Sequence, residues 1–166
     1  MLRLFPIQQK EELLVIHQMA HRIWPVTYDY MLSQEQIAYM LEWMYAPDVL
    51  KSQFEKGQLF YRIQKQDELI GFVALEPNFQ NEETIKLQKF YFLPEYQNQG
   101  FGSKIFLQLF DLAQQLGFKR LILNVNKTNK ALPFYLKHGM EIIDEGVFDI
   151  GQGYVMDDFI LEKSWS

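Results

Sequence analysis

The sequence contains no cysteine. This excludes disulfide frameworks, cysteine-ligated zinc and any enzyme that works through a cysteine nucleophile. The sequence also lacks an apolar run approaching the roughly 20 residues that a membrane-spanning helix needs. Its first residues, MLRLFPIQQKEELL, have neither the charged start nor the extended apolar stretch of a secretory signal. We therefore expect a cytoplasmic protein without a membrane partner.

Positive charge is scarce as well. Lys and Arg number 16 against 21 Asp and Glu, which gives a formal net charge of −5. A broad nucleic-acid footprint needs a basic surface, so no nucleic-acid partner is expected. Hydrophobic residues, by contrast, make up 48% of the 166 residues, enough to bury a real core. Without repeats or linker-like stretches, the sequence predicts a single domain over residues 1–166.

The spacing of apolar residues predicts an α+β fold. Its centre is a strand–helix–strand unit, which implies one parallel strand pair in a mixed sheet. The predicted helices cover about 11–24, 33–44, 47–57, 101–116 and 129–138, with a capping box at Ser33 and Gln36. The predicted strands cover about 2–7, 58–64, 69–76, 84–93, 120–125, 140–148 and 154–161.

Apolar alternation slips in the strand predicted at 84–93. Leu87 is followed by two polar residues before Phe90, so the apolar parity changes. A β-bulge produces such a slip, and so does burial of both faces of the strand.

A glycine-rich turn, QNQGFG at 97–102, follows this strand and opens the next helix. Backbone N–H groups converge at a helix N-terminus, where phosphate oxygens bind, and glycine permits close approach. An ordinary turn is the alternative. A P-loop is excluded because Gly102, Ser103 and Lys104 stand in the wrong order, and a dinucleotide fingerprint would need glycine in place of Ile105.

The segment NVNKTNKALPFYLKHGM lies downstream. We expect Asn129 to cap its short helix and Tyr135 to lie near the middle of that helix. In isolation, Tyr135 is as well explained as a core aromatic.

Together these motifs resemble the GNAT superfamily of N-acetyltransferases. The turn at 97–102 matches its Gln/Arg-x-x-Gly-x-Gly/Ala signature, and LILNVNKTNKALPFYLKHGM matches the second half of the family, with Met140 in place of the usual Phe. A finer resemblance, in DIGQGYVMDDFILEK and IWPVTYDYMLSQEQIAYMLEWMY, is to the branch that includes bacterial polyamine acetyltransferases. The resemblance implies a mostly antiparallel central sheet with one parallel βαβ centre and helices on both faces.

The resemblance also implies acetyl-CoA as cosubstrate and direct acetyl transfer, in a ternary complex, to a primary amine of a small molecule, such as a polyamine, or of a peptide. Tyr135 matches the general acid that protonates the departing thiolate. The implied cofactor-binding residues are Phe90, Tyr91, Phe92, Gln97, Asn98, Gln99, Gly100, Phe101, Gly102, Ser103 and Asn129. No metal ligands are expected: His17 and His21 have the spacing of a zinc helix but lack a third ligand.

The general base stays open among Glu76, Asp149 and Asp157, with Glu76 placed first because it ends a strand at the expected cleft. Aromatic residues around the first two helices either pack the core or wall an acceptor pocket; they are Trp24, Tyr28, Tyr30, Tyr39, Trp43 and Tyr45. Two alternative functions stay open: a non-catalytic acetyl-CoA-binding sensor or interaction module, and a domain that binds another phosphate ligand without acyl chemistry. The acceptor amine and the oligomeric state, a homodimer included, stay open.

Overall fold

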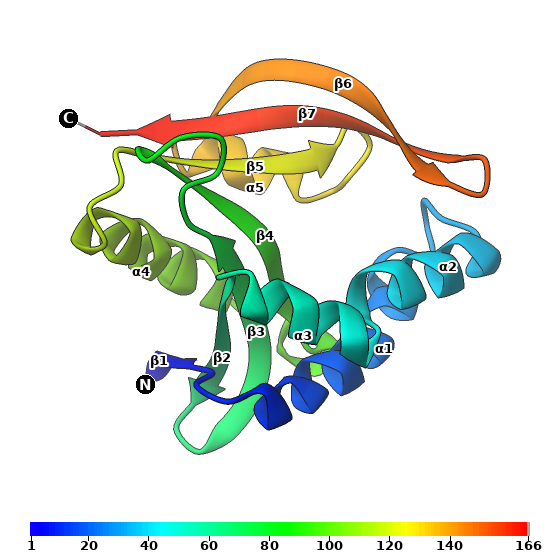
Figure 1. Ribbon diagram of the computed structural model, residues 1–166, viewed down its shortest axis with the longest axis horizontal. Helices are drawn as coiled ribbons and strands as arrows, with labels where there is room; N and C mark the ends of the chain where they lie inside the picture. The colour runs from blue at the N-terminus through cyan, green and yellow to red at the C-terminus, as the bar shows by residue number, and fades with distance from the viewer. Residues whose placement is uncertain (166) are drawn as a thin grey trace.

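The computed structural model describes residues 1–165, and its elements follow the predicted order (Figure 1). The strands are β1 (Leu2–Pro6), β2 (Leu59–Lys65), β3 (Glu68–Glu76), β4 (Thr84–Phe92), β5 (Arg120–Asn126), β6 (Glu141–Gly151) and β7 (Tyr154–Ser164). The α-helices are α1 (Leu14–Thr27), α2 (Gln34–Tyr45), α3 (Pro47–Glu55), α4 (Phe101–Gln115) and α5 (Leu132–Lys137). Two 3₁₀-helices, η1 (Lys10–Leu13) and η2 (Pro94–Tyr96), precede α1 and α4.

The strands form one seven-stranded sheet in the order β1-β2-β3-β4-β5-β7-β6. β4 and β5 are parallel, and the other neighbouring strands are antiparallel. Helices α1 to α3 pack against one face through one hydrophobic cluster, while α4 packs against the other face through a second cluster (Figure 1). The predicted fold class is confirmed.

A bulge interrupts the pairing of β3 with β4. Ala74 lies opposite Lys89 and Leu75 lies opposite Leu87, so Gln88 is an extra residue on β4. Of the two explanations of the parity slip that the sequence left open, the structure shows the β-bulge. It places Leu87 and Phe90 in the core beneath α4 and turns Lys89 and Tyr91 toward α1 to α3.

The two parallel strands separate soon after they begin. Thr84 to Lys86 of β4 pair with Arg120 to Ile122 of β5, and no further pair joins the two strands within residues 1–165. Figure 1 shows β4 and β5 diverging beyond this short ladder. The diverging strands leave main-chain groups of β4 without a neighbouring strand, which matters for ligand binding.

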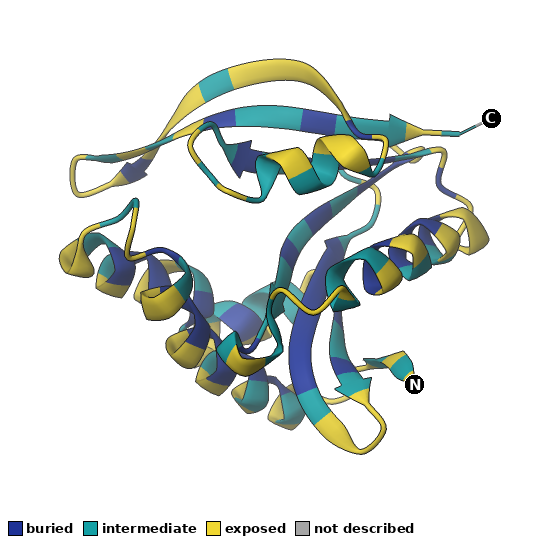
Figure 2. Cartoon of the chain, turned by 180° about the vertical axis from the view of Figure 1, so that it is seen from behind, coloured by how far each residue is buried: buried dark blue, intermediate teal, exposed yellow. Residues whose placement is uncertain are grey.

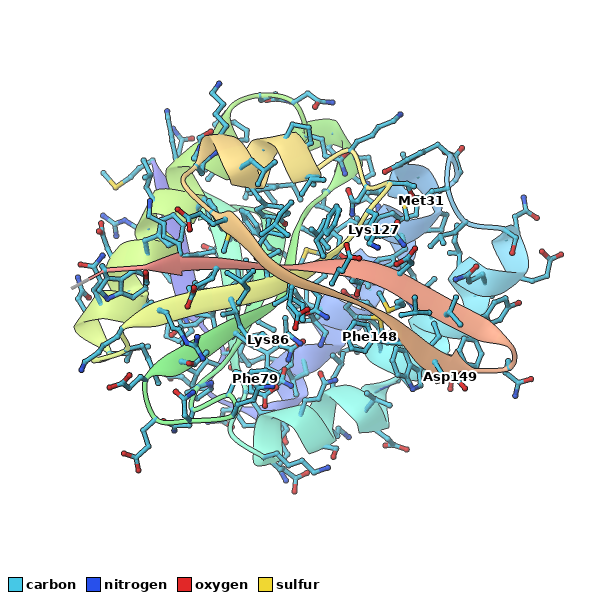
Figure 3. The ribbon with its side chains drawn as sticks, turned by 90° about the horizontal axis from the view of Figure 1, so that it is seen from above. Met31, Phe79, Lys86, Lys127, Phe148 and Asp149 are labelled. Atoms are coloured by element: carbon cyan, nitrogen blue, oxygen red, sulfur yellow. The ribbon has the colours of Figure 1, made fainter. Side chains whose placement is uncertain are left out.

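Strands β6 and β7 form a long hairpin that reaches α2. Its turn is Gln152-Gly153, with φ values of 56° and 78°, which suits a tight two-residue hairpin. Figure 3 shows β6 crossing over β7, with Asp149 near this turn, and Figure 2 shows how exposed the arch of β6 is. The Tyr39 hydroxyl donates a hydrogen bond to the Ile150 carbonyl and so ties α2 to the hairpin.

Two predicted helix boundaries were wrong. The first helix was expected to end at Trp24-Pro25, but α1 continues to Thr27 because Ile23 and Trp24 are buried in the core and hold its last turn in place. Asn129 was expected to cap the short helix, yet α5 begins at Leu132. The Asn129 side chain instead accepts a hydrogen bond from the Ala131 N–H at 2.8 Å and shapes the loop before the helix.

Candidate active site

In the turn between β4 and α4, no described side chain caps the backbone N–H groups at the start of the helix. Gly100 is the N-cap residue of α4, with φ of 81°. The first N–H groups of a helix have no partner within it, so they are available to an anion. Gly102 faces the Phe134 ring: a Cβ placed there would lie 3.4 Å from Phe134 Cε1. A Cβ at Gly100 would have nothing within 4 Å, so the backbone at Gly100 is the part of the turn that is open to close approach.

Amide side chains within this turn hold it to the rest of the protein. Gln97 Nε2 donates to Thr27 Oγ1 at 3.1 Å and to the Phe92 carbonyl at 3.0 Å, which joins the ends of α1 and β4. Gln99 Nε2 donates to the Glu95 carbonyl at 2.7 Å. These side chains shape the turn and leave the α4 N-terminus unobstructed.

A cleft of about 220 Å³ lies where β4 and β5 separate. Its lining residues come from β4, β5, the end of α1 and the segment that contains α5, and they are Thr27, Tyr28, Leu87, Gln88, Lys89, Phe90, Tyr91, Phe92, Gln97, Leu123, Asn124, Val125, Asn129, Ala131 and Tyr135. Of the predicted cofactor-binding residues, Phe90, Tyr91, Phe92, Gln97 and Asn129 therefore share one cleft.

Tyr135 projects from α5 into this cleft. Its ring packs against Phe106 and Phe134, with centroid distances of 5.5 Å and 5.4 Å. Burial raises the pKa of the Tyr135 hydroxyl well above its usual value, and the nearby Tyr28 raises it further. The phenol is therefore protonated at neutral pH, which a proton donor requires, while its raised pKa makes it a weaker acid than a free tyrosine.

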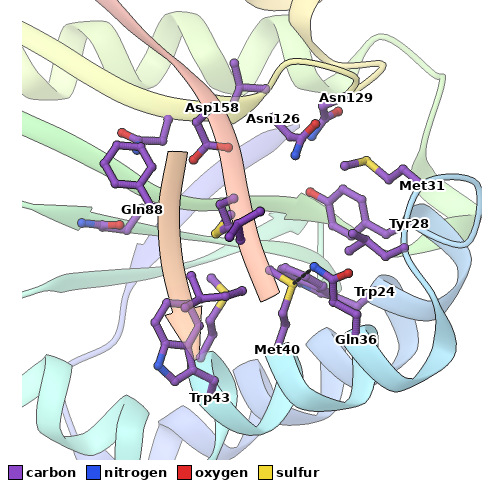
Figure 4. Close-up of a pocket in the computed structure, with 18 of the residues that line it drawn as sticks. Trp24, Tyr28, Met31, Gln36, Met40, Trp43, Gln88, Asn126, Asn129 and Asp158 are labelled. Carbon is purple, nitrogen blue, oxygen red and sulfur yellow. Dashed lines mark hydrogen bonds between the residues drawn. The ribbon is translucent and has the colours of Figure 1, made fainter. Parts of the chain in front are cut away.

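A second cavity, of about 330 Å³, adjoins the cleft (Figure 4). Its walls come from α1, α2, β4, β5, β6 and β7. The residues shared by the cavity and the cleft are Tyr28, Leu87, Gln88, Tyr91, Asn124, Val125 and Asn129. The two spaces thus meet beside the bulge of β4.

Asp158 of β7 lines this cavity and was missed by the sequence reasoning, which considered only its neighbour Asp157. Asp158 is 2% exposed, and its Oδ1 atom has no hydrogen-bond partner among the described residues. In Figure 4 its carboxylate points toward the enclosed space. Burial raises the pKa of Asp158, although Asn124 and Lys86 pull it in the other direction. The available signal was an acid placed between Met156 and Ile160 on one face of a strand.

The three predicted base candidates occupy different surroundings. Glu76 lies outside the lining of both spaces, but its Oε1 accepts a hydrogen bond at 2.8 Å from the side chain of Gln88, which lines both. Asp149 lines the cavity and accepts from the Gly151 N–H at 2.8 Å. Asp157 forms an ion pair with Lys127 at 3.1 Å.

The aromatic residues of the first two helices divide between the two predicted roles. Trp24, Tyr28 and Trp43 line the cavity. Tyr45 is fully buried in the core, and the Tyr30 hydroxyl accepts a hydrogen bond from the Lys130 N–H at 2.8 Å.

Neither a metal site nor a membrane span is found in the part of the chain that the structure describes. No group of three or more His, Asp and Glu side chains within residues 1–165 is placed to hold a metal ion. His17 Nδ1 lies 2.8 Å from the Tyr45 carbonyl, and His21 Nδ1 lies 2.9 Å from the His17 carbonyl. No described helix is long and apolar enough to cross a bilayer.

Comparison with known proteins identifies the family. The model of the acetyltransferase (GNAT) family matches residues 16–140. A spermidine N(1)-acetyltransferase from Thermoplasma acidophilum is 26% identical over 161 residues, which cover 93% of this chain and 92% of the relative. The uncharacterized N-acetyltransferase YjgM from Escherichia coli (strain K12) is 32% identical over 92 residues, so the match spans about half of each protein, 54% of this chain and 55% of the relative.

The fold is similar to that of the PaiA N-acetyltransferase from Thermoplasma acidophilum, solved in complex with coenzyme A. The TM-score is 0.80 at 23% identity, and 99% of each chain is covered. The family match covers most of the chain and includes the turn at 97–102 and Tyr135. The chain therefore belongs to the acetyltransferase (GNAT) family of acetyl-CoA-dependent N-acetyltransferases.

Proposed function

We propose that residues 1–166 form a single domain that transfers the acetyl group of acetyl-CoA directly to a primary amine within a ternary complex. The observation that carries this proposal is the junction of the two spaces: the cleft beside Tyr135 opens into the cavity beside Tyr91 and Gln88. A donor in the cleft and an amine in the cavity would meet without a covalent enzyme intermediate, in keeping with the absence of cysteine.

The residues present fit acetyl-CoA. The α4 N-terminus offers unobstructed N–H groups to a pyrophosphate at Gly100, Phe101, Gly102 and Ser103, in a turn shaped by Gln97, Asn98 and Gln99. The edge of β4 left free by the separation from β5 offers main-chain groups to an extended arm. Asn129 lies where the cleft meets the cavity and completes the proposed binding set.

Bound acetyl-CoA supplies a thioester, and the amine nitrogen attacks its carbonyl carbon. Backbone N–H groups near Tyr91 and Phe92 donate hydrogen bonds to the carbonyl oxygen as negative charge develops on it. Tyr135 gives its proton to the departing sulfur. The burial that raises the pKa of Tyr135 also raises the proton affinity of a thiolate in the same cleft, so the transfer stays feasible.

The amine must be neutral to attack, because a free alkylammonium with a pKa of about 10 is almost wholly protonated at neutral pH. Glu76 is the proposed base. Glu76 contacts the cavity only through Gln88, whose side chain donates a hydrogen bond to it, so the proton of the amine would reach Glu76 by way of a water.

The acceptor is an amine of a small molecule or a peptide, and the Thermoplasma relative makes polyamines one class to test. The test is to incubate the protein with acetyl-CoA and a panel of amines and to measure acetylated products by mass spectrometry. Formation of an N-acetyl product supports the proposal. Tight acetyl-CoA binding without any product would instead support the non-catalytic sensor.

A further inference from the structure

We propose that the cavity takes a primary monoamine with an apolar body, such as an arylalkylamine, and that Asp158 binds its ammonium group on entry. The bound ammonium then gives one proton to the base through water, and the neutral nitrogen attacks the thioester carbonyl carbon. This inference rests on the proposed function and narrows the acceptor class. It sets the chain apart from the polyamine specificity that the name of its Thermoplasma relative states.

The first argument is the condition of Asp158. Its side chain is buried, and a buried carboxylate is costly unless it is paired. Asn124 and Lys86 offset part of this cost, since both lower the pKa of Asp158, but Oδ1 itself has no hydrogen-bond partner among residues 1–165. The side chain points into a cavity that is continuous with the cleft for the acetyl donor. An ammonium group supplies the charge and the donors that Oδ1 lacks, so binding a cation there relieves a cost already present in the protein.

The second argument is the set of aromatic and Met side chains in the cavity wall, which lies beside the amide side chains of Gln36, Gln88, Asn124, Asn126 and Asn129. Aromatic faces attract the cationic end of a ligand, and flexible Met side chains adapt to an apolar body. These wall residues are Trp24, Tyr28, Met31, Met40, Phe148 and Met156. A volume of about 330 Å³ suits a small ligand.

The third argument is the charge of the lining. The Asp and Glu side chains among the lining residues are Asp149 and Asp158, and Lys86 brings a positive charge. Asp149 already accepts a hydrogen bond from the Gly151 N–H near the hairpin turn. Two acids and one lysine give the lining a net charge of −1, which a single ammonium group balances. A polyamine with three or four ammonium groups would face Lys86 and would leave most of its charges without a carboxylate.

The primary experiment compares kcat/KM for 2-phenylethylamine and spermidine with the wild-type protein at saturating acetyl-CoA. We expect kcat/KM for 2-phenylethylamine to be higher than that for spermidine by at least about tenfold. One charge-assisted hydrogen bond gives a difference of this size. Preference for spermidine would overturn the monoamine inference and leave the proposed acetyl transfer intact. No turnover of any amine would overturn the proposed function itself.

The role of Asp158 is tested by Asp158→Asn, which keeps the side-chain shape and removes the charge. We expect KM for 2-phenylethylamine to rise by about tenfold to hundredfold while KM for acetyl-CoA is unchanged. The matched control is Asp144→Asn, an exposed acid of β6 outside the cavity lining, which should leave both constants unchanged. An unchanged KM for the amine in Asp158→Asn would overturn the assignment.

A variant that adds a negative charge tests the same charge argument if Asp158→Asn folds poorly. Met156→Glu adds an acid to the cavity wall and should raise the spermidine to 2-phenylethylamine ratio of kcat/KM by about tenfold. Folding is checked by circular dichroism, and acetyl-CoA binding by titration calorimetry. An unchanged ratio in a folded, acetyl-CoA-binding variant would contradict the charge argument.

Discussion

The hydroxyl oxygens of Tyr28 and Tyr91 lie 2.8 Å apart and form a hydrogen bond that joins α1 to β4 at the boundary between the cleft and the cavity. Both side chains are surrounded by protein, and burial is the main cause that raises the pKa of Tyr28, to about 12, and the pKa of Tyr91 well above its usual value. The pair is therefore neutral, and its two rings fix the position of β4 relative to the cavity of about 330 Å³.

The effects of removing the two hydroxyls of this pair on the free energy of unfolding should not be additive. Tyr91→Phe leaves the Tyr28 hydroxyl without this partner and should cost about 1 to 3 kcal/mol of unfolding free energy. The double variant Tyr28→Phe/Tyr91→Phe should cost less than the sum of the single variants. Urea unfolding of the four proteins measures the coupling, and strict additivity would mean that the hydrogen bond contributes nothing.

Replacing Tyr135 with Phe should lower turnover and spare cofactor binding. The ring contacts with Phe106 and Phe134 are kept, while the proton donor is lost. We expect kcat to fall by about 100-fold or more, in the range of general acid catalysis. Steady-state kinetics and calorimetric titration with acetyl-CoA measure the two effects separately. Unchanged turnover would show that another group protonates the sulfur.

Substitution of Gly100 should weaken acetyl-CoA binding beyond its effect on stability. Gly100→Ala forces a Cβ onto a residue with φ of 81° at the proposed phosphate site. Gly117→Ala is the matched control, because Gly117 follows the opposite end of α4 with φ of 91° and also has open space around it.

Both glycine variants should lose about 1 kcal/mol of stability, a typical cost for a residue held in the left-handed region. Only Gly100→Ala should raise the dissociation constant of acetyl-CoA, and Gly100→Val should raise it further. Equal binding by Gly100→Ala, Gly100→Val and Gly117→Ala would rule out the phosphate site.

The free energy of unfolding should rise between pH 7.5 and 9.5 because Lys89 loses its proton in the folded protein over this range. Burial lowers the pKa of Lys89 to about 8, although Nζ donates to Gln53 Oε1 at 2.8 Å and Glu76 raises the pKa slightly. The unfolded chain keeps this proton up to about pH 10.5, so it binds more protons than the folded protein between these values.

We expect wild type to gain about 2 kcal/mol over this pH interval relative to Lys89→Met, which has no such group. Urea unfolding at both pH values measures the gain. If wild type and Lys89→Met show the same pH dependence, the lowered pKa of Lys89 is wrong.

Replacing Glu76 with Gln should slow the reaction in a pH-dependent manner. Loss of the base matters most at neutral pH, where the amine is charged, and least near the pKa of the amine, where the free base is abundant. A pH profile of kcat/KM should therefore show the variant approaching wild type as the pH rises. A loss that is constant with pH would indicate that Glu76 only positions Gln88. Asp149→Asn and Asp157→Asn, measured alongside, test the other two candidates.

The central part of the site was predictable because local patterns carry it. The parity slip after Leu87 indicated the bulge at Gln88, and the spacing of Gly100 and Gly102 indicated an exposed helix N-terminus. The spacing between that turn and Tyr135 belongs to the family pattern, and the structure brings Tyr135 into the same cleft as Tyr91.

The features missed from the sequence depend on contacts between distant segments. Asp158 is buried because β7 lies between β5 and β6 and faces α1 and α2 across the cavity. Met156 and Ile160 on the same face of the strand indicate burial, but nothing near position 158 reveals which elements cover it. The last turn of α1 persists past Pro25 because its neighbours Ile23 and Trp24 are held in the core. Local propensity describes neither effect.

The order of the elements along the chain separates the two halves of the site. The cleft comes mainly from β4, β5 and the segment that contains α5, in the middle of the sequence. Much of the cavity wall comes from α1, α2, β6 and β7, nearer the two ends. Substitutions in these outer elements would change which amine is accepted while the donor side stays intact. Related proteins can therefore diverge in acceptor preference by drift at the ends of the chain, with the acetyl-transfer machinery inherited unchanged.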